Sequence, residues 1–184
     1  MKKLLLTLAL AFTTSLALAD FVVLETGKSN AVGNTSNDVF FKYNYDFNKH
    51  FAADVENLTV QITNDGAVTH TVQDRAELGV VGRLPLGFAT LQGRISYGTK
   101  FSTTNYDYYT YSPSIVVPVA NTGITLKAEY RWRKSVTEGK EDTQISRIGG
   151  WYDLTKNDSI GYRFDHYTGS SPQNINSVFY QRSF

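Results

Sequence analysis

The chain has 184 residues, with 18 Lys and Arg balanced by 17 Asp and Glu, and it contains no cysteine. This near-neutral charge argues against nucleic acid as the main partner, and the absence of cysteine excludes a disulfide framework. After the N-terminal segment no apolar run is long enough for a membrane-spanning helix, and the mean hydropathy is −0.28.

Residues 1–19 have the pattern of a secretory signal peptide. Lys2 and Lys3 form a short basic region, residues 4–18 are an apolar run relieved only by Thr and Ser, and residues 17–19 match the small-x-small cleavage pattern. The apolar run is too short to favour a membrane-spanning helix. We therefore predict cleavage after residue 19 and one mature domain at residues 20–184. Its formal net charge changes from +1 to −1, because two lysines are lost.

The mature chain shows the two-residue period of β-strands. Residues 39–47 alternate, with Val39, Phe41, Tyr43, Tyr45 and Phe47 on one face and Lys42, Asn44 and Asp46 on the other. Residues 51–63 change phase near Glu56-Asn57, and there we predict a β-bulge.

Residues 124–133 give the clearest signal in the chain. The even positions, from Ile124 to Trp132, are apolar or aromatic, whereas the odd positions are Thr, Lys, Glu, Arg and Arg. One face of this strand therefore carries four ionised groups and the other is as apolar as a protein core. Residues 143–154 form a later strand, which we predict to be disturbed at Gly149-Gly150.

The C-terminal strand ends in an aromatic residue. Val178, Tyr180 and Phe184 share one face of it. This pattern resembles the C-terminal signature of bacterial outer-membrane β-barrel proteins, whose last strand ends in Phe and is recognised by the barrel-assembly machinery. Arg182 departs from the pattern, because that family has an apolar or aromatic residue two positions before the end.

Ten strands are predicted in all, and the others lie at residues 21–27, 75–84, 89–97, 106–117 and 159–167. Short turns are expected at residues 47–50, 85–87, 119–123 and 155–158. Longer polar loops are expected at residues 27–37, 63–71, 98–105, 135–142 and 169–174. Short turns at one rim, longer loops at the other and an even strand number are typical of outer-membrane barrels, whose two termini lie at the short-turn rim.

The predicted fold is all-β: a single closed, antiparallel, up-and-down transmembrane barrel of about ten strands, within a range of roughly eight to twelve. The sheet must close because an unpaired backbone group is costly in hydrocarbon. Lys or Arg facing lipid at the midplane would cost about 2–4 kcal/mol, so the charged faces are expected to line the lumen. The alternative is a periplasmic β-sandwich or lipocalin-like barrel with its apolar face inside.

The predicted lumen residues are Lys42, Arg75, Glu77, Arg83, Arg94, Lys127, Glu129, Arg131, Arg133, Arg147, Arg163 and Asp165, with Glu25 and Asp46 as further acidic partners. Two interpretations stay open. The charges can pair into a network that fills a narrow barrel, or their basic surplus can line a small channel that favours anions, because guanidinium groups suit carboxylate and phosphate.

The C-terminal third resembles the small monomeric porins for acidic oligosaccharides, in the motifs Tyr130-Arg-Trp-Arg133 and Tyr162-Arg-Phe-Asp165. The resemblance implies an Arg-lined lumen. That family has more strands, so its transport specificity is not carried over. We predict a small porin-like channel in the cell outer membrane for ions or small solutes, including anionic ones. The alternative is a non-conducting structural or adhesive barrel with ligand-binding surface loops.

An enzymatic function is a remote alternative. His166-Tyr-Thr168 resembles the His-x-Ser segment of the lipid A 3-O-deacylases, which act at the outer leaflet. Thr168 stands in place of the Ser, and the final strand lacks the expected acidic group. Ser170 or Ser171 would need a different geometry. We therefore expect no catalytic residues, and no cofactor or metal motif is found. The expected partners are outer-membrane lipid, lipopolysaccharide, small solutes and, through the strand ending at Phe184, the barrel-assembly machinery.

Overall fold

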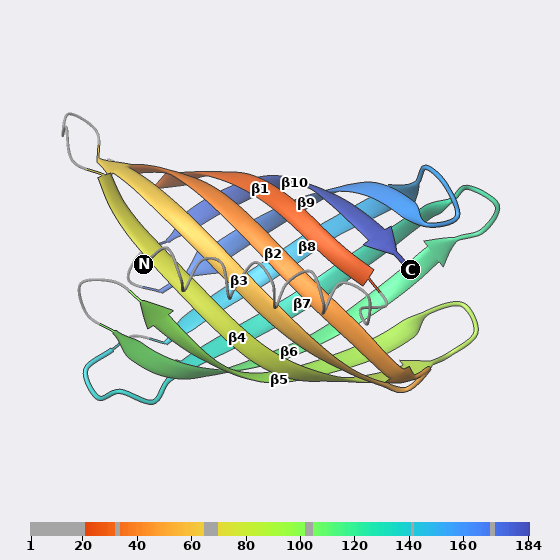
Figure 1. The fold of residues 1–184 in the computed structure, drawn as a ribbon, viewed down its shortest axis with the longest axis horizontal. Coiled ribbons are helices and arrows are strands. Elements are labelled where there is room, and N and C mark those ends of the chain that lie inside the picture. The colour runs from red at the N-terminus through yellow and green to blue at the C-terminus, as the bar shows by residue number, and fades with distance from the viewer. Residues whose placement is uncertain (1–20, 32–33, 65–69, 102–104, 141, 170–171) are drawn as a thin grey trace, which may run out of the picture.

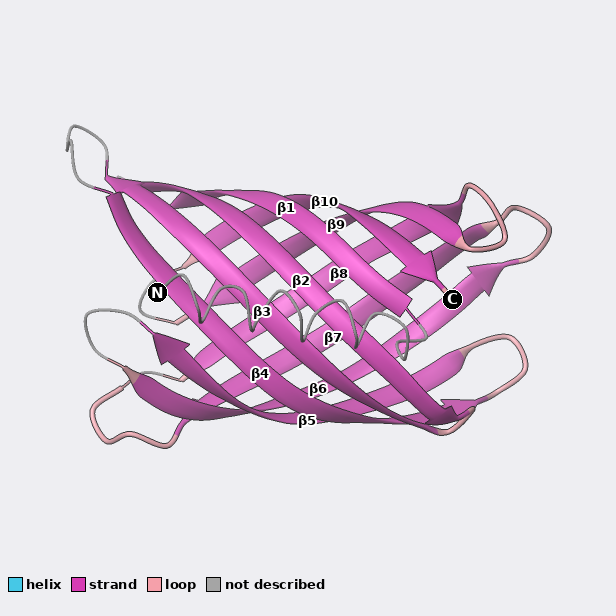
Figure 2. Ribbon diagram, viewed as in Figure 1, coloured by secondary structure: helices cyan, strands magenta, loops and turns pink. Residues whose placement is uncertain are grey.

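Ten β-strands form one closed barrel (Figures 1 and 2). The computed structural model describes residues 21–31, 34–64, 70–101, 105–140, 142–169 and 172–184. The strands are β1 (Phe21–Ala31), β2 (Asn34–Asn48), β3 (Phe51–Asn64), β4 (His70–Pro85), β5 (Thr90–Phe101), β6 (Tyr106–Val119), β7 (Ile124–Ser135), β8 (Thr143–Asp153), β9 (Asp158–Thr168) and β10 (Gln173–Ser183). Each pairs antiparallel with its sequence neighbours, and β10 closes against β1.

This arrangement confirms the predicted all-β, closed, antiparallel barrel of ten strands. The predicted signal peptide lies outside the described residues. Within the described part of the chain, no helix is long and apolar enough to cross a membrane.

The two ends of the barrel differ. Four short turns, joining β2 to β3, β4 to β5, β6 to β7 and β8 to β9, lie at one end, which we call the short-turn rim. The start of β1 and the end of β10 lie at this same rim (Figure 1). The opposite end, the loop rim, holds the other connections. Two of the short turns contain a glycine with positive φ, Gly87 at 84° and Gly123 at 70°, a conformation that side chains disfavour.

The strands continue further toward the loop rim than predicted. The expected loop at residues 27–37 is mostly strand, because Gly27 to Ala31 pair with Asn34 to Asp38. Likewise β5 continues to Phe101, beyond the expected loop start at Gly98. Polar Ser, Thr and Asn weaken the hydrophobic alternation that marks a strand in sequence. They do not weaken the backbone hydrogen bonds between strands, so the hairpins extend beyond the part of the strands that has apolar outer side chains.

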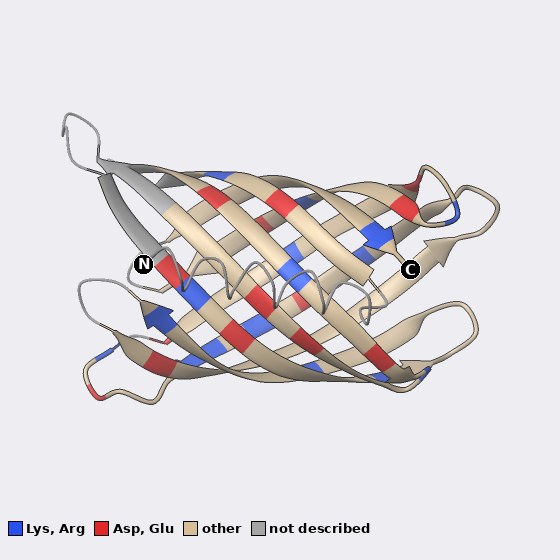
Figure 3. Cartoon of the chain, viewed as in Figure 1, with Lys and Arg blue, Asp and Glu red and all other residues tan. Residues whose placement is uncertain are grey.

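The barrel has its apolar side outward and its charges inward. Outward-facing Leu78 and Ile148 are 64% and 61% exposed, whereas inward-facing Arg131 and Asp165 are 4% and 1% exposed. Acidic and basic positions follow one another along and across the strands (Figure 3). An exposed apolar wall around a charged interior is the reverse of a water-soluble barrel, and it suits a surrounding of lipid.

The predicted β-bulge at Glu56-Asn57 is wrong. β3 pairs without a register shift from Phe51 to Thr63 against β4, and the shift in this region lies between Asp46 and Asn48, beside the turn. The apparent phase change arises because Leu58 and Val60 face inward like the charged residues before them. They can do so because the loop-rim half of the interior has apolar members, including the buried cluster Ile145, Tyr167 and Ile175.

The predicted disturbance at Gly149-Gly150 is also wrong, since β8 stays in register with both β7 and β9. Ile145, Arg147, Gly149 and Trp151 all lie on the inward face, so apolar residues again obscured the period. The two glycines allow the backbones of neighbouring strands to approach closely. A Cβ added at Gly149 would lie 2.6 Å from the carbonyl oxygen of Tyr162, and one at Gly150 would lie 2.8 Å from that of Thr125.

Arg182, the departure from the C-terminal pattern, has a local partner. Its side chain is exposed on the outer face at the short-turn rim, where its Nη1 lies 3.2 Å from Oδ1 of Asp158. The hydroxyl of Tyr180 donates to the same carboxylate. A paired guanidinium at the rim can reach water, which reduces the cost of its outward position.

Candidate functional site

The structure places all twelve predicted lumen residues on the interior face of the barrel. Most belong to one continuous set of ion pairs, which we call the ion-pair network. Its members are Glu25, Lys42, Asp54, Glu56, Glu77, Arg94, Lys127, Glu129, Arg131, Arg133, Arg147, Arg163 and Asp165. The network crosses the interior because opposite charges come from strands on different sides of the barrel.

Arg94 is the centre of one half of the network. Its Nε donates to both oxygens of Asp54 at 2.9 Å, and its Nη1 donates to Glu77 at 2.8 Å. Lys42 donates to Asp54 at 2.7 Å and to Glu56 at 3.1 Å. Glu56 also contacts Arg131 and Glu77 also contacts Arg133, so each of these three carboxylates pairs with at least two cations.

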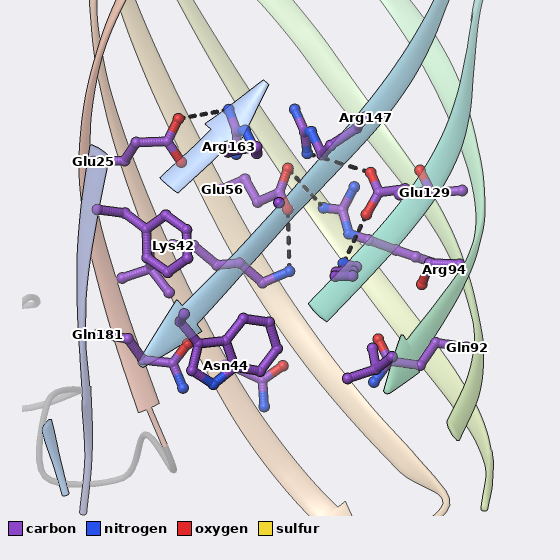
Figure 4. A pocket seen from close by; sticks show the side chains of 18 of the residues that line it. Glu25, Lys42, Asn44, Glu56, Gln92, Arg94, Glu129, Arg147, Arg163 and Gln181 are labelled. Carbon is purple, nitrogen blue, oxygen red and sulfur yellow. Dashed lines mark hydrogen bonds and ion pairs between the residues drawn. The ribbon is translucent and has the colours of Figure 1, made fainter. Parts of the chain in front are cut away.

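The other half of the network continues through β7, β8 and β9. Arg131 contacts Glu56 at 3.3 Å and Glu129 at 3.1 Å. Arg147 contacts Glu129 (Figure 4), and its Nη2 lies 2.7 Å from Asp165, so it joins the two carboxylates. Arg163 then contacts Asp165 at 3.2 Å, and its Nη2 lies 2.6 Å from Glu25 of β1.

Aromatic rings support the cations toward the loop rim. The guanidinium of Arg133 lies 4.7 Å from the ring centroid of Tyr108, and the hydroxyl of Tyr108 donates to Glu77 at 3.1 Å. Arg163 lies 5.4 Å from the ring centroid of Phe40. Such cation–π contacts gain strength when water is excluded. Tyr108, which is fully buried, was not foreseen as an interior residue.

Sequence reasoning also missed the carboxylates of Asp38, Asp54 and Glu56. Asp54 and Glu56 are 2% and 4% exposed, and both pair with Arg94. They were missed because the supposed bulge broke the period of β3 at this point. Uninterrupted alternation from Ala52 would have placed them inside. Among the described residues, the nine predicted interior cations thus face eight acidic groups, and Lys100 of β5 adds a tenth cation toward the loop rim, so the interior has a small basic surplus. The acidic groups are Glu25, Asp38, Asp46, Asp54, Glu56, Glu77, Glu129 and Asp165.

The described interior residues enclose a larger and a smaller cavity. The larger, about 260 Å³, occupies the half toward the short-turn rim, and we call it the short-turn cavity. The smaller void, about 20 Å³, lies on the side of the loop rim. Both are lined by the same six residues, namely Glu25, Phe40, Glu56, Arg131, Arg147 and Arg163. These six, which we call the belt, therefore separate the two cavities.

The described residues give no support to a metal site, since no group of three or more His, Asp or Glu among them could hold a metal ion. His166 and Thr168, of the remote deacylase alternative, are both exposed on the outer face. The Nδ1 of His166 lies 2.7 Å from the side-chain oxygen of Asn174, which is an amide and not a carboxylate. Ser170 and Ser171 lie outside the described residues.

Solved structures share this architecture. The COG4313 outer membrane channel from Pseudomonas putida F1 has a TM-score of 0.59 and 10% identity, covering 90% of this chain and 95% of that one. The NanC porin has a TM-score of 0.58 and 7% identity, covering 89% and 100%. The KdgM porin in complex with disordered oligogalacturonate has a TM-score of 0.51 and 14% identity, covering 88% and 99%.

The chain has the fold of outer-membrane porin-like barrels. The identities are too low to carry more than the fold, and no family model or curated protein matches the sequence. A shared fold does not fix function, which depends on the chemistry of the barrel interior.

Proposed function

We propose that the chain is a narrow outer-membrane channel for ions and small solutes, with the belt as its constriction. The observation that carries this proposal is the charged interior of a barrel whose outer wall is apolar, hollowed by a cavity of about 260 Å³ that begins near the short-turn rim. The porin fold supports the same function. A signal peptide at residues 1–19 and outer-membrane insertion through the strand ending at Phe184 belong to this proposal, as does the absence of enzymatic activity.

A second candidate is a non-conducting barrel that is rigid and presents its loops to surface ligands. It is favoured by the burial of the ion pairs, because Arg131 and Glu56 are each 4% exposed and the void on the loop-rim side of the belt is only about 20 Å³. In the channel, these side chains have to part before a solute passes. In the rigid barrel, they never do.

Conductance of the refolded protein in a planar bilayer distinguishes the two. The channel should show discrete current steps, with ion selectivity measurable in a salt gradient. Replacing both Arg131 and Arg133 by Gln should raise the current and shift selectivity toward cations, since the carboxylates of Glu56, Glu129 and Glu77 then lose cationic partners. Lys134→Gln on the outer face of β7 is the matched control and should leave selectivity unchanged.

The rigid barrel predicts the opposite pattern. Stranding buried carboxylates should cost about 3–5 kcal/mol of unfolding free energy, measured by urea denaturation in detergent. A wild-type barrel that never conducts, together with this loss of stability in the double variant, would reject the channel.

A further inference from the structure

The short-turn cavity is built asymmetrically. Most of its charged groups gather at the belt end, whereas Asn44, Gln92 and Gln181 lie toward the other end (Figure 4), where Arg83 is the register partner of Gln92. Its lining has seven Lys or Arg but only three Glu. Other carboxylates that neutralise these cations, such as Asp54 and Asp165, lie behind them at 2% and 1% exposure. The cavity surface is therefore more basic than the interior as a whole.

One side of this cavity is aromatic. Trp151 of β8 and Phe179 of β10 both line it, and both are register partners of Gly161 on the intervening β9. A Cβ at Gly161 would lie 2.2 Å from the ring of Phe179, so that ring covers the glycine. The result is a continuous apolar surface across three neighbouring strands.

A cation borders this aromatic surface. Lys127 of β7 is the register partner of Gly149 on β8, two residues before Trp151, and of Val116 on β6. Its side chain is 30% exposed, more than the other cations of the ion-pair network, and its ion-pair partner is Glu129 at 2.7 Å. An ammonium group has three N–H donors, so a second acceptor can bind beside Glu129.

We propose that the short-turn cavity binds small amphipathic monocarboxylates, with the carboxylate at Lys127 and the apolar body against Trp151 and Phe179. A purely polar anion would leave the aromatic surface uncovered, and a neutral apolar molecule would leave the ammonium without an added partner. The volume of about 260 Å³ admits a single small molecule and excludes an oligomer. This inference names a solute class for the proposed channel and rests on that function only for its biological consequence.

The chain contains its own reporter for this site. It has two Trp residues, of which Trp132 is exposed on the outer face and Trp151 lines the cavity. In a Trp132→Phe background, the fluorescence of Trp151 can be followed in detergent as cyclohexanecarboxylate is added. The emission should change saturably. Acetate, which lacks the apolar body, and cyclohexylmethanol, which lacks the charge, should each bind at least tenfold more weakly.

A substitution then tests the cation. Lys127→Gln in the same background should weaken cyclohexanecarboxylate at least tenfold and leave cyclohexylmethanol unchanged, whereas Lys134→Gln should alter neither. Equal binding of the three compounds, no saturable change in folded protein, or an unaffected Lys127→Gln variant would each overturn the site. The comparison of the three compounds uses protein with Lys127 intact, so it tests the proposed site even if the Lys127→Gln variant misfolds. Binding in detergent does not require conduction. The binding experiment can therefore support the proposed site when the conductance experiment rejects the channel, and the conductance experiment can support the channel when the binding experiment rejects the site.

Discussion

At the scale of single residues, inward-facing glycines make room for the ion-pair network. A Cβ at Gly79 would lie 2.6 Å from Oδ1 of Asp54 and 2.8 Å from Nε of Arg94. The network therefore depends on a position that has no side chain. On β5, Gly93 faces outward and has no atom within 4 Å of an added Cβ.

These two glycines give a matched pair of variants. Gly79→Val should force Asp54 and Arg94 apart and leave both poorly paired, which lowers the unfolding free energy by about 3–5 kcal/mol. Gly93→Val should be close to neutral or slightly stabilising, since Val favours strands. Urea denaturation of the two variants in the same detergent measures both effects. Equal stabilities would contradict the role assigned to the Asp54–Arg94 pair.

The interior charges show how far single residues can be predicted. Lys42, Arg94 and Arg163 alternate with apolar neighbours in their strands, and the period alone places them inside. Asp54 and Glu56 escaped prediction because Leu58 and Val60, on the same face, look like lipid-facing residues. Which cation pairs with which carboxylate depends on contacts across the barrel, and these have no local signal in sequence.

At the scale of elements, the strands and short turns were predictable, whereas the hairpin lengths at the loop rim were not. β7 carries a complete period of two from Ile124 to Arg133, and all its inward and outward positions agree with it. The β1–β2 hairpin is built from Ser, Thr and Asn near its tip, so its pairing leaves no hydrophobic pattern.

Orientation in the membrane can be tested at this scale. Glu138, between β7 and β8, and Lys156, between β8 and β9, are both exposed and lie at opposite rims. A Glu138→Cys variant should react with a membrane-impermeant maleimide on intact cells, because long loops face outward in such barrels. Lys156→Cys should react only after the envelope is opened. Labelling of Lys156→Cys in intact cells would reverse the assigned orientation.

At the scale of the whole molecule, closure makes the barrel resistant to detergent. Every strand has two paired edges, so no edge is free to fray. Unboiled protein should therefore migrate faster than boiled protein on a detergent gel, because the folded barrel is compact and binds less detergent. A mature protein that stays soluble without detergent and shows no such difference would instead favour a periplasmic sandwich.

The contact between Arg163 and Glu25 spans the place where the chain's two ends meet, since β9 and β1 lie on either side of β10. A sheet in which β1 and β10 had not yet paired would have unpaired charged side chains near its open edges. Such an open sheet is poorly suited to hydrocarbon, whereas the closed barrel keeps those charges inside and away from lipid. The cost of exposing unpaired charges to hydrocarbon therefore favours closure of the ring before the barrel leaves an aqueous surrounding.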